Sequence, residues 1–85
     1  MLAFTDRARE ILRRTHEAAR RFNPDAAVRV SVAPDGEVRF DLVDRPGEGD
    51  LVVEEDGFVL YVAPGVGGTV DVVEPHDRLV LRPGA

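Results

Sequence analysis

The chain has 85 residues, no cysteine and a formal net charge of −5, which predicts one small domain over residues 1–85 and excludes disulfides, thiolate metal sites and thiol nucleophiles. Residues 1–22 hold six arginines against three acidic residues, whereas residues 23–85 hold five arginines against thirteen acidic residues, and so acidic a body argues against nucleic-acid binding. No apolar run approaches the roughly 20 residues of a membrane-spanning helix, and the start of the chain lacks the apolar stretch of a signal peptide, so we expect a cytoplasmic protein without membrane contact.

The first segment has the periodicity of a helix over residues 6–22. Thr5 is a suitable N-cap, and Asp6 places a negative charge at the positive end of the helix dipole. One face carries a stripe of apolar or small side chains at helical spacing, namely Ala8, Ile11, Leu12, Thr15, Ala19 and Phe22. The opposite face carries two acid–arginine pairs four residues apart, Glu10 with Arg14 and Glu17 with Arg21. Pro24 ends the helix, because the residue before a proline disfavours helical geometry.

After residue 24 apolar and polar residues alternate, as they do in strands with one buried face. We predict six strands, at about residues 28–32, 37–43, 51–55, 58–62, 69–74 and 78–82. Three turn signals join these strands in pairs, namely Pro34-Asp35-Gly36, Asp56-Gly57 and Pro75-His76-Asp77. The expected fold class is therefore α+β, with one N-terminal helix packed on short, mostly antiparallel β-hairpins. Edge strands left by so small a sheet also favour a homodimer.

Several segments, in this order, resemble a known domain. They are TDRAREIL, VRVSV, GDLVVEEDGFVLYV, TVDVV and LRPGA. Together they resemble the A-type iron–sulfur carrier domain, the HesB/IscA-like family, over nearly the whole chain. The resemblance implies a β-sandwich with a packed helix and a relationship to iron–sulfur cluster assembly.

The chain departs from that family at the positions of its cluster ligands. One family cysteine lies in the turn after the first strand, where this chain has Ala33-Pro34-Asp35-Gly36, and two lie in a C-terminal Cys-Gly-Cys tail, where this sequence reads Gly84-Ala85. An iron–sulfur cluster needs sulfur ligands, for which carboxylates and a lone imidazole are poor substitutes. We therefore expect the fold in a cysteine-free form, with no cofactor and no metal site.

Other polar residues give weaker signals. His16 lies at the edge of the helical stripe and is expected to hydrogen-bond nearby backbone, and His76 is expected in a solvated turn. The run Gly65-Val66-Gly67-Gly68 precedes a strand rather than a helix, which favours a tight connector over a phosphate cradle. Ser31 lies within an alternating strand, without the strained turn of a hydrolase nucleophile. An enzyme is the least favoured class.

Three functions remain open. The favoured one is an interaction or structural module that docks an acidic protein through Arg9, Arg13 and Arg20 on one flank of the helix. The second is an accessory role in iron–sulfur cluster biogenesis beside a cysteine-bearing partner. The third is a small-molecule-binding domain, because β-folds often offer pockets.

Overall fold

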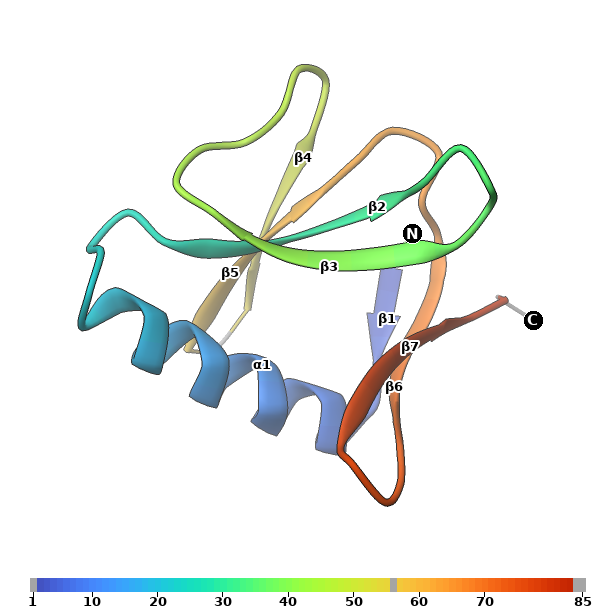
Figure 1. Ribbon diagram of the computed structural model, residues 1–85, viewed down its shortest axis with the longest axis horizontal. Coiled ribbons are helices and arrows are strands. Elements are labelled where there is room, and N and C mark those ends of the chain that lie inside the picture. Colours follow the sequence, from blue (N-terminus) through green and yellow to red (C-terminus); the bar gives the residue numbers. More distant parts are fainter. Residues whose placement is uncertain (1, 56, 84–85) are drawn as a thin grey trace.

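The computed structural model describes residues 2–55 and 57–83. Its elements are strand β1 (Leu2–Phe4), helix α1 (Asp6–Arg20), and strands β2 (Ala27–Val32), β3 (Val38–Val43), β4 (Leu51–Glu55), β5 (Phe58–Val62), β6 (Gly68–Val73) and β7 (Arg78–Arg82). Figure 1 shows the helix lying along one side of the strands. Within the described ranges no helix is long and apolar enough to cross a membrane.

The strands form two sheets. The larger sheet has the order β3-β2-β5-β4, and the smaller has the order β1-β6-β7. The three predicted hairpins are present, because β2 pairs with β3, β4 with β5 and β6 with β7, all antiparallel. The pairings of β1 with β6 and of β2 with β5 are parallel. The expected α+β class with mostly antiparallel pairing is therefore confirmed.

The six predicted strands are all present, with ends shifted by no more than one residue. Of the predicted Asp56-Gly57 turn, Asp56 lies outside the described residues, while Gly57 has a φ of +93°, which glycine adopts readily. Gly84 and Ala85 also lie outside the described residues.

Strand β1 has no counterpart among the predicted elements. It pairs with β6 in a parallel register, with Leu2 opposite Gly68 and Phe4 opposite Val70. The Thr5 N–H continues this ladder by donating to the Val70 carbonyl at 3.0 Å. Three residues are too few to show an alternating pattern, so only the pairing with a distant strand makes this segment a strand.

Helix α1 begins where the sequence predicts, because the Thr5 side chain accepts a hydrogen bond from the Ala8 N–H at 3.2 Å. It ends at Arg20, two residues earlier than expected. The prediction that Phe22 belongs to the buried stripe is wrong, since this residue is 92% exposed. The turn before Pro24 redirects the chain, and the Asn23 N–H bonds the Ala19 carbonyl at 3.0 Å.

Of the two predicted acid–arginine pairs on the helix, one forms. Arg14 Nη2 lies 2.8 Å from Glu10 Oε1. Glu17 and Arg21 make no ion pair in the described structure, and Arg21 is the C-cap residue of the helix.

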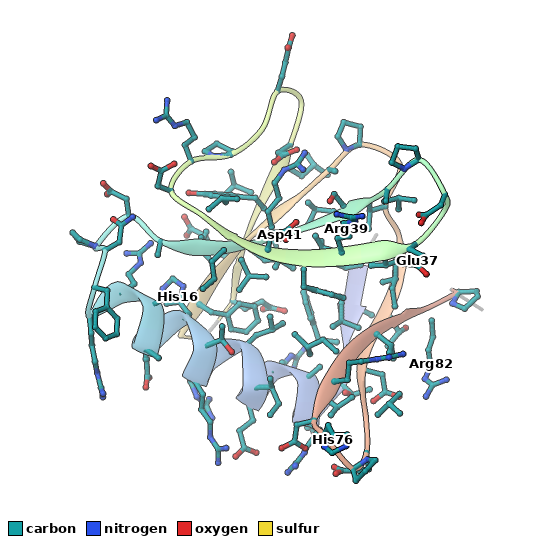
Figure 2. The ribbon with its side chains drawn as sticks, viewed as in Figure 1. His16, Glu37, Arg39, Asp41, His76 and Arg82 are labelled. Carbon is teal, nitrogen blue, oxygen red and sulfur yellow. The ribbon has the colours of Figure 1, made fainter. Side chains whose placement is uncertain are left out.

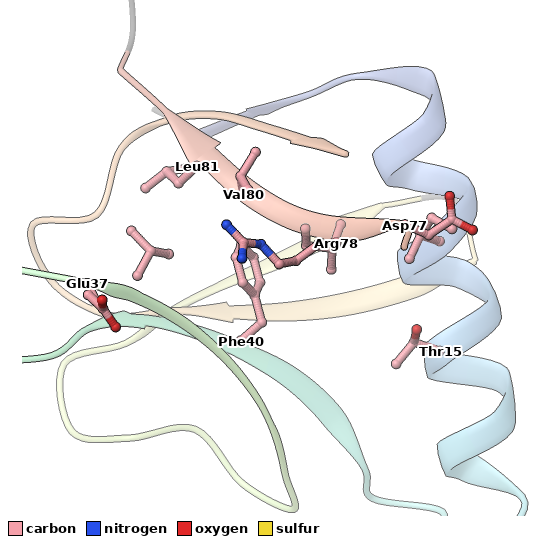
Figure 3. A pocket seen from close by; sticks show the side chains of 10 residues that line it. Thr15, Glu37, Phe40, Asp77, Arg78, Val80 and Leu81 are labelled. Atoms are coloured by element: carbon pink, nitrogen blue, oxygen red, sulfur yellow. The ribbon is translucent and has the colours of Figure 1, made fainter. Parts of the chain in front are cut away.

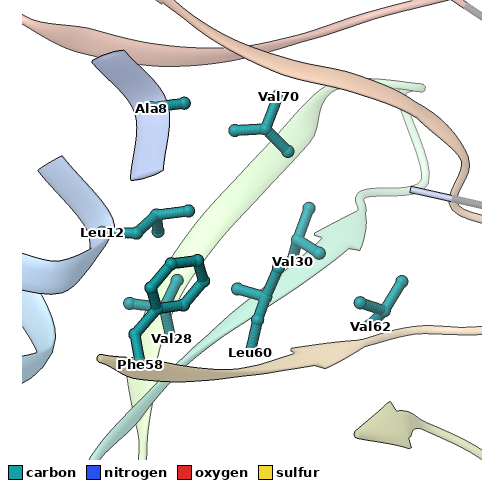
Figure 4. Close-up of a cluster of buried hydrophobic side chains, with 8 residues drawn as sticks. All are labelled: Ala8, Leu12, Val28, Val30, Phe58, Leu60, Val62 and Val70. Atoms are coloured by element: carbon teal, nitrogen blue, oxygen red, sulfur yellow. The ribbon is translucent and has the colours of Figure 1, made fainter. Parts of the chain in front are cut away.

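The hydrophobic core lies between the helix and both sheets. Its fully buried large side chains are Leu12, Leu60, Val30 and Val70. Figure 4 shows Ala8 and Leu12 of the helix facing the buried side chains of the strands. The rings of Phe4 and Phe58 meet edge to face with centroids 5.8 Å apart, which joins the small sheet to the large one.

Candidate functional site

A groove of about 720 Å³ lies between strands β3 and β7, beside helix α1 (Figure 3). These two strands are edge strands of different sheets, so no ladder closes the space between them. The groove is lined by Ile11, Thr15, Glu37, Val38, Phe40, Asp77, Arg78, Leu79, Val80 and Leu81. Its volume is within the range of small-molecule sites, roughly 300–1,000 Å³.

Charged side chains lie among the apolar lining of this groove. Asp77 accepts a hydrogen bond from Arg7 Nη2 at 2.7 Å, and this guanidinium lowers the pKa of the Asp77 carboxyl below its usual value. Arg78 forms no ion pair with any residue that the structure describes. The groove therefore presents the Arg78 guanidinium, which has no ion-pair partner among the described residues, and the carboxylates of Glu37 and Asp77, on partly apolar walls.

The turn at residues 33–36 comes directly before Glu37 and Val38, two residues that line this groove. Its conformation is held by its own backbone, with the Ala33 N–H donating to the Glu37 carbonyl at 2.8 Å. Asp35 offers the only charged side chain of the turn, and its Oδ1 accepts the Glu37 N–H at 3.0 Å. One hydrogen-bonded carboxylate does not fit an iron–sulfur cluster, which requires several soft sulfur ligands. Elsewhere in the described ranges no three His, Cys, Asp or Glu side chains gather as a metal site.

The two histidines lie near different ends of the helix and do not converge (Figure 2). His16 is half-buried, and its Nδ1 atom is buried without a hydrogen-bond partner. The expected backbone hydrogen bond is therefore wrong for this nitrogen. Burial lowers the pKa of His16, and the charge of Arg20 lowers it further. His76 is exposed in the turn between β6 and β7, as the sequence predicts.

The structure places the three arginines of the predicted docking flank beside the β4–β5 hairpin and the start of β2. Arg9 Nη2 lies 3.7 Å from Glu55 Oε1, and Arg20 Nε donates to the Ala26 carbonyl at 3.0 Å. The aliphatic part of the Arg13 side chain packs closely against Gly57. A Cβ atom at position 57 would lie only 2.7 Å from Arg13 Cδ. All three side chains nevertheless stay exposed.

A bidentate ion pair fixes the loop at residues 44–50. Arg29 Nε lies 2.7 Å from Asp50 Oδ2, and Arg29 Nη2 lies 2.9 Å from Asp50 Oδ1. Asp50 has a side chain that is 0% exposed and also accepts the Gly47 N–H at 2.7 Å. The hydrogen bonds from Arg29 lower the pKa of the Asp50 carboxyl. Nothing in the sequence pattern links two residues 21 positions apart, so sequence reasoning missed this pair.

No family model matches the sequence, and no curated protein matches it. Solved structures match it in fold. The crystal structure of Escherichia coli SufA, involved in biosynthesis of iron–sulfur clusters, has a TM-score of 0.70 at 26% identity, with 95% of this chain and 81% of SufA covered. The crystal structure of IscA with a 2Fe–2S cluster has a TM-score of 0.50 at 22% identity, with 96% and 82% covered. The chain therefore has the HesB/IscA-like fold of the A-type iron–sulfur carriers, in a form whose 85 residues include no cysteine.

Proposed function

We propose that this chain is a non-enzymatic, cytoplasmic interaction module, built on the carrier fold but not binding a cluster by itself. The donor set supports this proposal above all. Thiolates hold iron–sulfur clusters in proteins, and none of the 85 residues is a cysteine. At the first ligand position of the fold the turn offers only Asp35, whose carboxylate is already bonded to backbone.

A second candidate is an accessory role in iron–sulfur cluster biogenesis. The likeness to SufA and IscA favours it. In this role a cysteine-bearing partner supplies every sulfur ligand, and the present chain supplies a docking surface. A third candidate, binding of a small molecule, draws support from the groove of about 720 Å³ between β3 and β7.

Anaerobic incubation with ferrous iron and sulfide tests the first proposal. After gel filtration we expect a colourless protein without sulfide-to-iron charge-transfer absorption, because no thiolate is present to retain the cluster. Iron and acid-labile sulfide are measured on the same fraction. A cysteine-bearing carrier treated in parallel should become brown, which shows that the reagents work.

A brown protein with stoichiometric sulfide would contradict the proposal. The accessory role is tested separately, by mixing the chain with the cluster-loaded carrier before gel filtration. Elution of both proteins together favours that role, and separate elution removes it.

We further propose that the flank with Arg9, Arg13 and Arg20 contacts an acidic protein. Planar guanidinium groups grip carboxylates with two hydrogen bonds, and the three side chains stay exposed. Arg13 is the best to vary, because it makes no ion pair or side-chain hydrogen bond within the described residues, whereas Arg9 and Arg20 contact Glu55 and Ala26.

Arg13→Glu should weaken binding to a poly-L-glutamate probe by roughly threefold at low salt, since one exposed charge contact is worth up to about 1 kcal/mol. Fluorescence anisotropy measures the affinity. Arg45→Glu is the matched control, because it makes the same change in net charge at a side chain that is 83% exposed in the β3–β4 loop. Equal weakening by both variants would show that the net charge, and not this flank, governs binding.

A further inference from the structure

Strand β3 is an open edge of the larger sheet. It pairs only with β2, with Arg39 opposite Ser31 and Asp41 opposite Arg29. The bond from the Ala33 N–H to the Glu37 carbonyl shows that the odd-numbered residues of this ladder direct their backbone groups toward β2. In antiparallel pairs such positions alternate. The N–H and C=O groups of Val38, Phe40 and Leu42 therefore point to the free edge, where another strand can bind them.

The outer face of this edge carries two opposite charges, those of Arg39 and Asp41. Arg39 and Asp41 lie two residues apart, so they share one face of the sheet, and both are exposed (Figure 2). Neither forms an ion pair with another described residue. Arg29 lies opposite Asp41 across the ladder but directs its guanidinium to Asp50.

We propose that a second copy of the chain binds this edge, strand β3 against strand β3, antiparallel about a twofold axis at Phe40. Each Arg39 then lies opposite Asp41 of the other copy, and each Val38 lies opposite Leu42. The outward backbone groups of the even-numbered residues meet in hydrogen-bonded pairs, which leaves the charged residues in the closer, non-hydrogen-bonded pairs. Two four-stranded sheets become one continuous sheet. The proposal does not depend on whether either copy handles iron.

The charges favour this register over the two neighbouring ones. A shift of the twofold axis by one residue toward the strand's start places Arg39 opposite Arg39. A shift by one residue toward its end places Asp41 opposite Asp41. Like charges directly opposite each other destabilise a strand pair, and opposite charges stabilise it. Of these three axes, only the one at Phe40 forms two attractive pairs between Arg39 and Asp41 and no repulsive one.

The other described edge strands lack this self-complementarity. Strand β7 has an arginine at each end and no acidic residue, so pairing about Val80 would oppose Arg78 and Arg82. Strand β4 carries Glu54 and Glu55 without a basic residue. Strand β1 has only three residues. Among these edges, β3 is the one whose charges fit a second copy of itself.

Exposed apolar side chains lie at the end of β3 that the second copy would approach. Leu42 is 58% exposed, and together with Phe22, Ala19 and Ala26 it lines a second hollow of about 590 Å³. The proposed register brings this end of one copy to Val38 of the other, which lines the groove beside β7. Association would thus remove apolar surface from water at both ends of the paired strands.

Sedimentation equilibrium tests the proposal with charge-swap variants. The unmodified chain should be a dimer, and Arg39→Asp and Asp41→Arg should each raise the dimer dissociation constant at least about tenfold, because the twofold axis makes both charge pairs repulsive. The double variant Arg39→Asp/Asp41→Arg restores both pairs and should dimerise again. A mixture of the two single variants should form heterodimers for the same reason.

Glu54→Arg is the control, because it makes the same change in net charge as Asp41→Arg on the outer side of strand β4. Circular dichroism checks that every variant is folded. A monomeric unmodified chain, a double variant that dissociates like the single ones, or equal weakening by Glu54→Arg would each overturn the proposal.

Discussion

Replacing Asp50 with alanine is expected to lower the melting temperature by roughly 10 °C. The change leaves the Arg29 guanidinium, which is partly buried, without its carboxylate, and leaves the Gly47 N–H without its acceptor. Polar groups that lose their partners in a protected site cost more than the lost attraction alone. Thermal denaturation followed by circular dichroism at pH 7 measures the shift.

Asp44→Ala is the matched control for this change. Asp44 is an exposed aspartate of the same loop, and its carboxylate lies 3.4 Å from Arg45 Nε. Exposed pairs of this kind contribute about 0–1 kcal/mol, so the shift should stay within a few degrees. Equal losses in both variants would show that the Arg29–Asp50 pair does not hold the loop.

The Asp50 pair also predicts an acid dependence. Hydrogen bonds from Arg29 lower the pKa of this carboxyl below the 3.8 of an unperturbed aspartate, so the unfolded chain binds more protons in that window. The stabilisation is complete above pH 3.8 and is lost as the pH falls through the lower pKa of the folded state. The melting temperature of Asp50→Ala should therefore fall less steeply with acid than that of the unmodified chain.

Leu60→Ala should lower the free energy of unfolding by about 3 kcal/mol. Leu60 is 0% exposed and lies on β5 between Val28 of β2 and Val53 of β4. Truncation removes buried methyl groups and leaves a cavity that neighbours on two strands fill only in part. Urea denaturation followed by circular dichroism measures the loss.

Leu51→Ala provides the control for the core substitution. It makes the same change on the adjacent strand β4, at a side chain that is 70% exposed. We expect a loss below about 1 kcal/mol, because little apolar surface leaves contact with the core. A similar loss at both positions would mean that Leu60 does not lie at the centre of the packing.

Local chemistry explains which elements the sequence predicts well. The Thr5 cap, the alternating valines and the proline and glycine turns act within a few residues, and each predicts its element where the structure has it. The end of the helix at Arg20 is less well predicted, because Phe22 fits the helical stripe by spacing alone.

Contacts between distant residues explain what the sequence does not predict. Strand β1 depends on β6, more than 60 residues away, and Asp50 depends on Arg29. The groove arises from the meeting of β3 and β7, which belong to different sheets. Neither hydrophobic periodicity nor turn residues indicate which distant segments of the chain come into contact. The lack of cysteine at residues 33–36, where the resemblance implies a ligand, is the exception, because residue identity alone reveals it.

The smaller sheet combines the first strand of the chain with its last two described strands. During synthesis on a ribosome, β2 to β5 emerge and can pair while β1 still has no neighbour. Val70 of β6 belongs to the buried cluster that includes Ala8 and Leu12 of the helix, and it is synthesised only after the four strands of the larger sheet. The nascent chain therefore leaves the part of the helix face that packs on β6 uncovered until β6 has emerged, whereas β2 and β5 can cover the rest earlier.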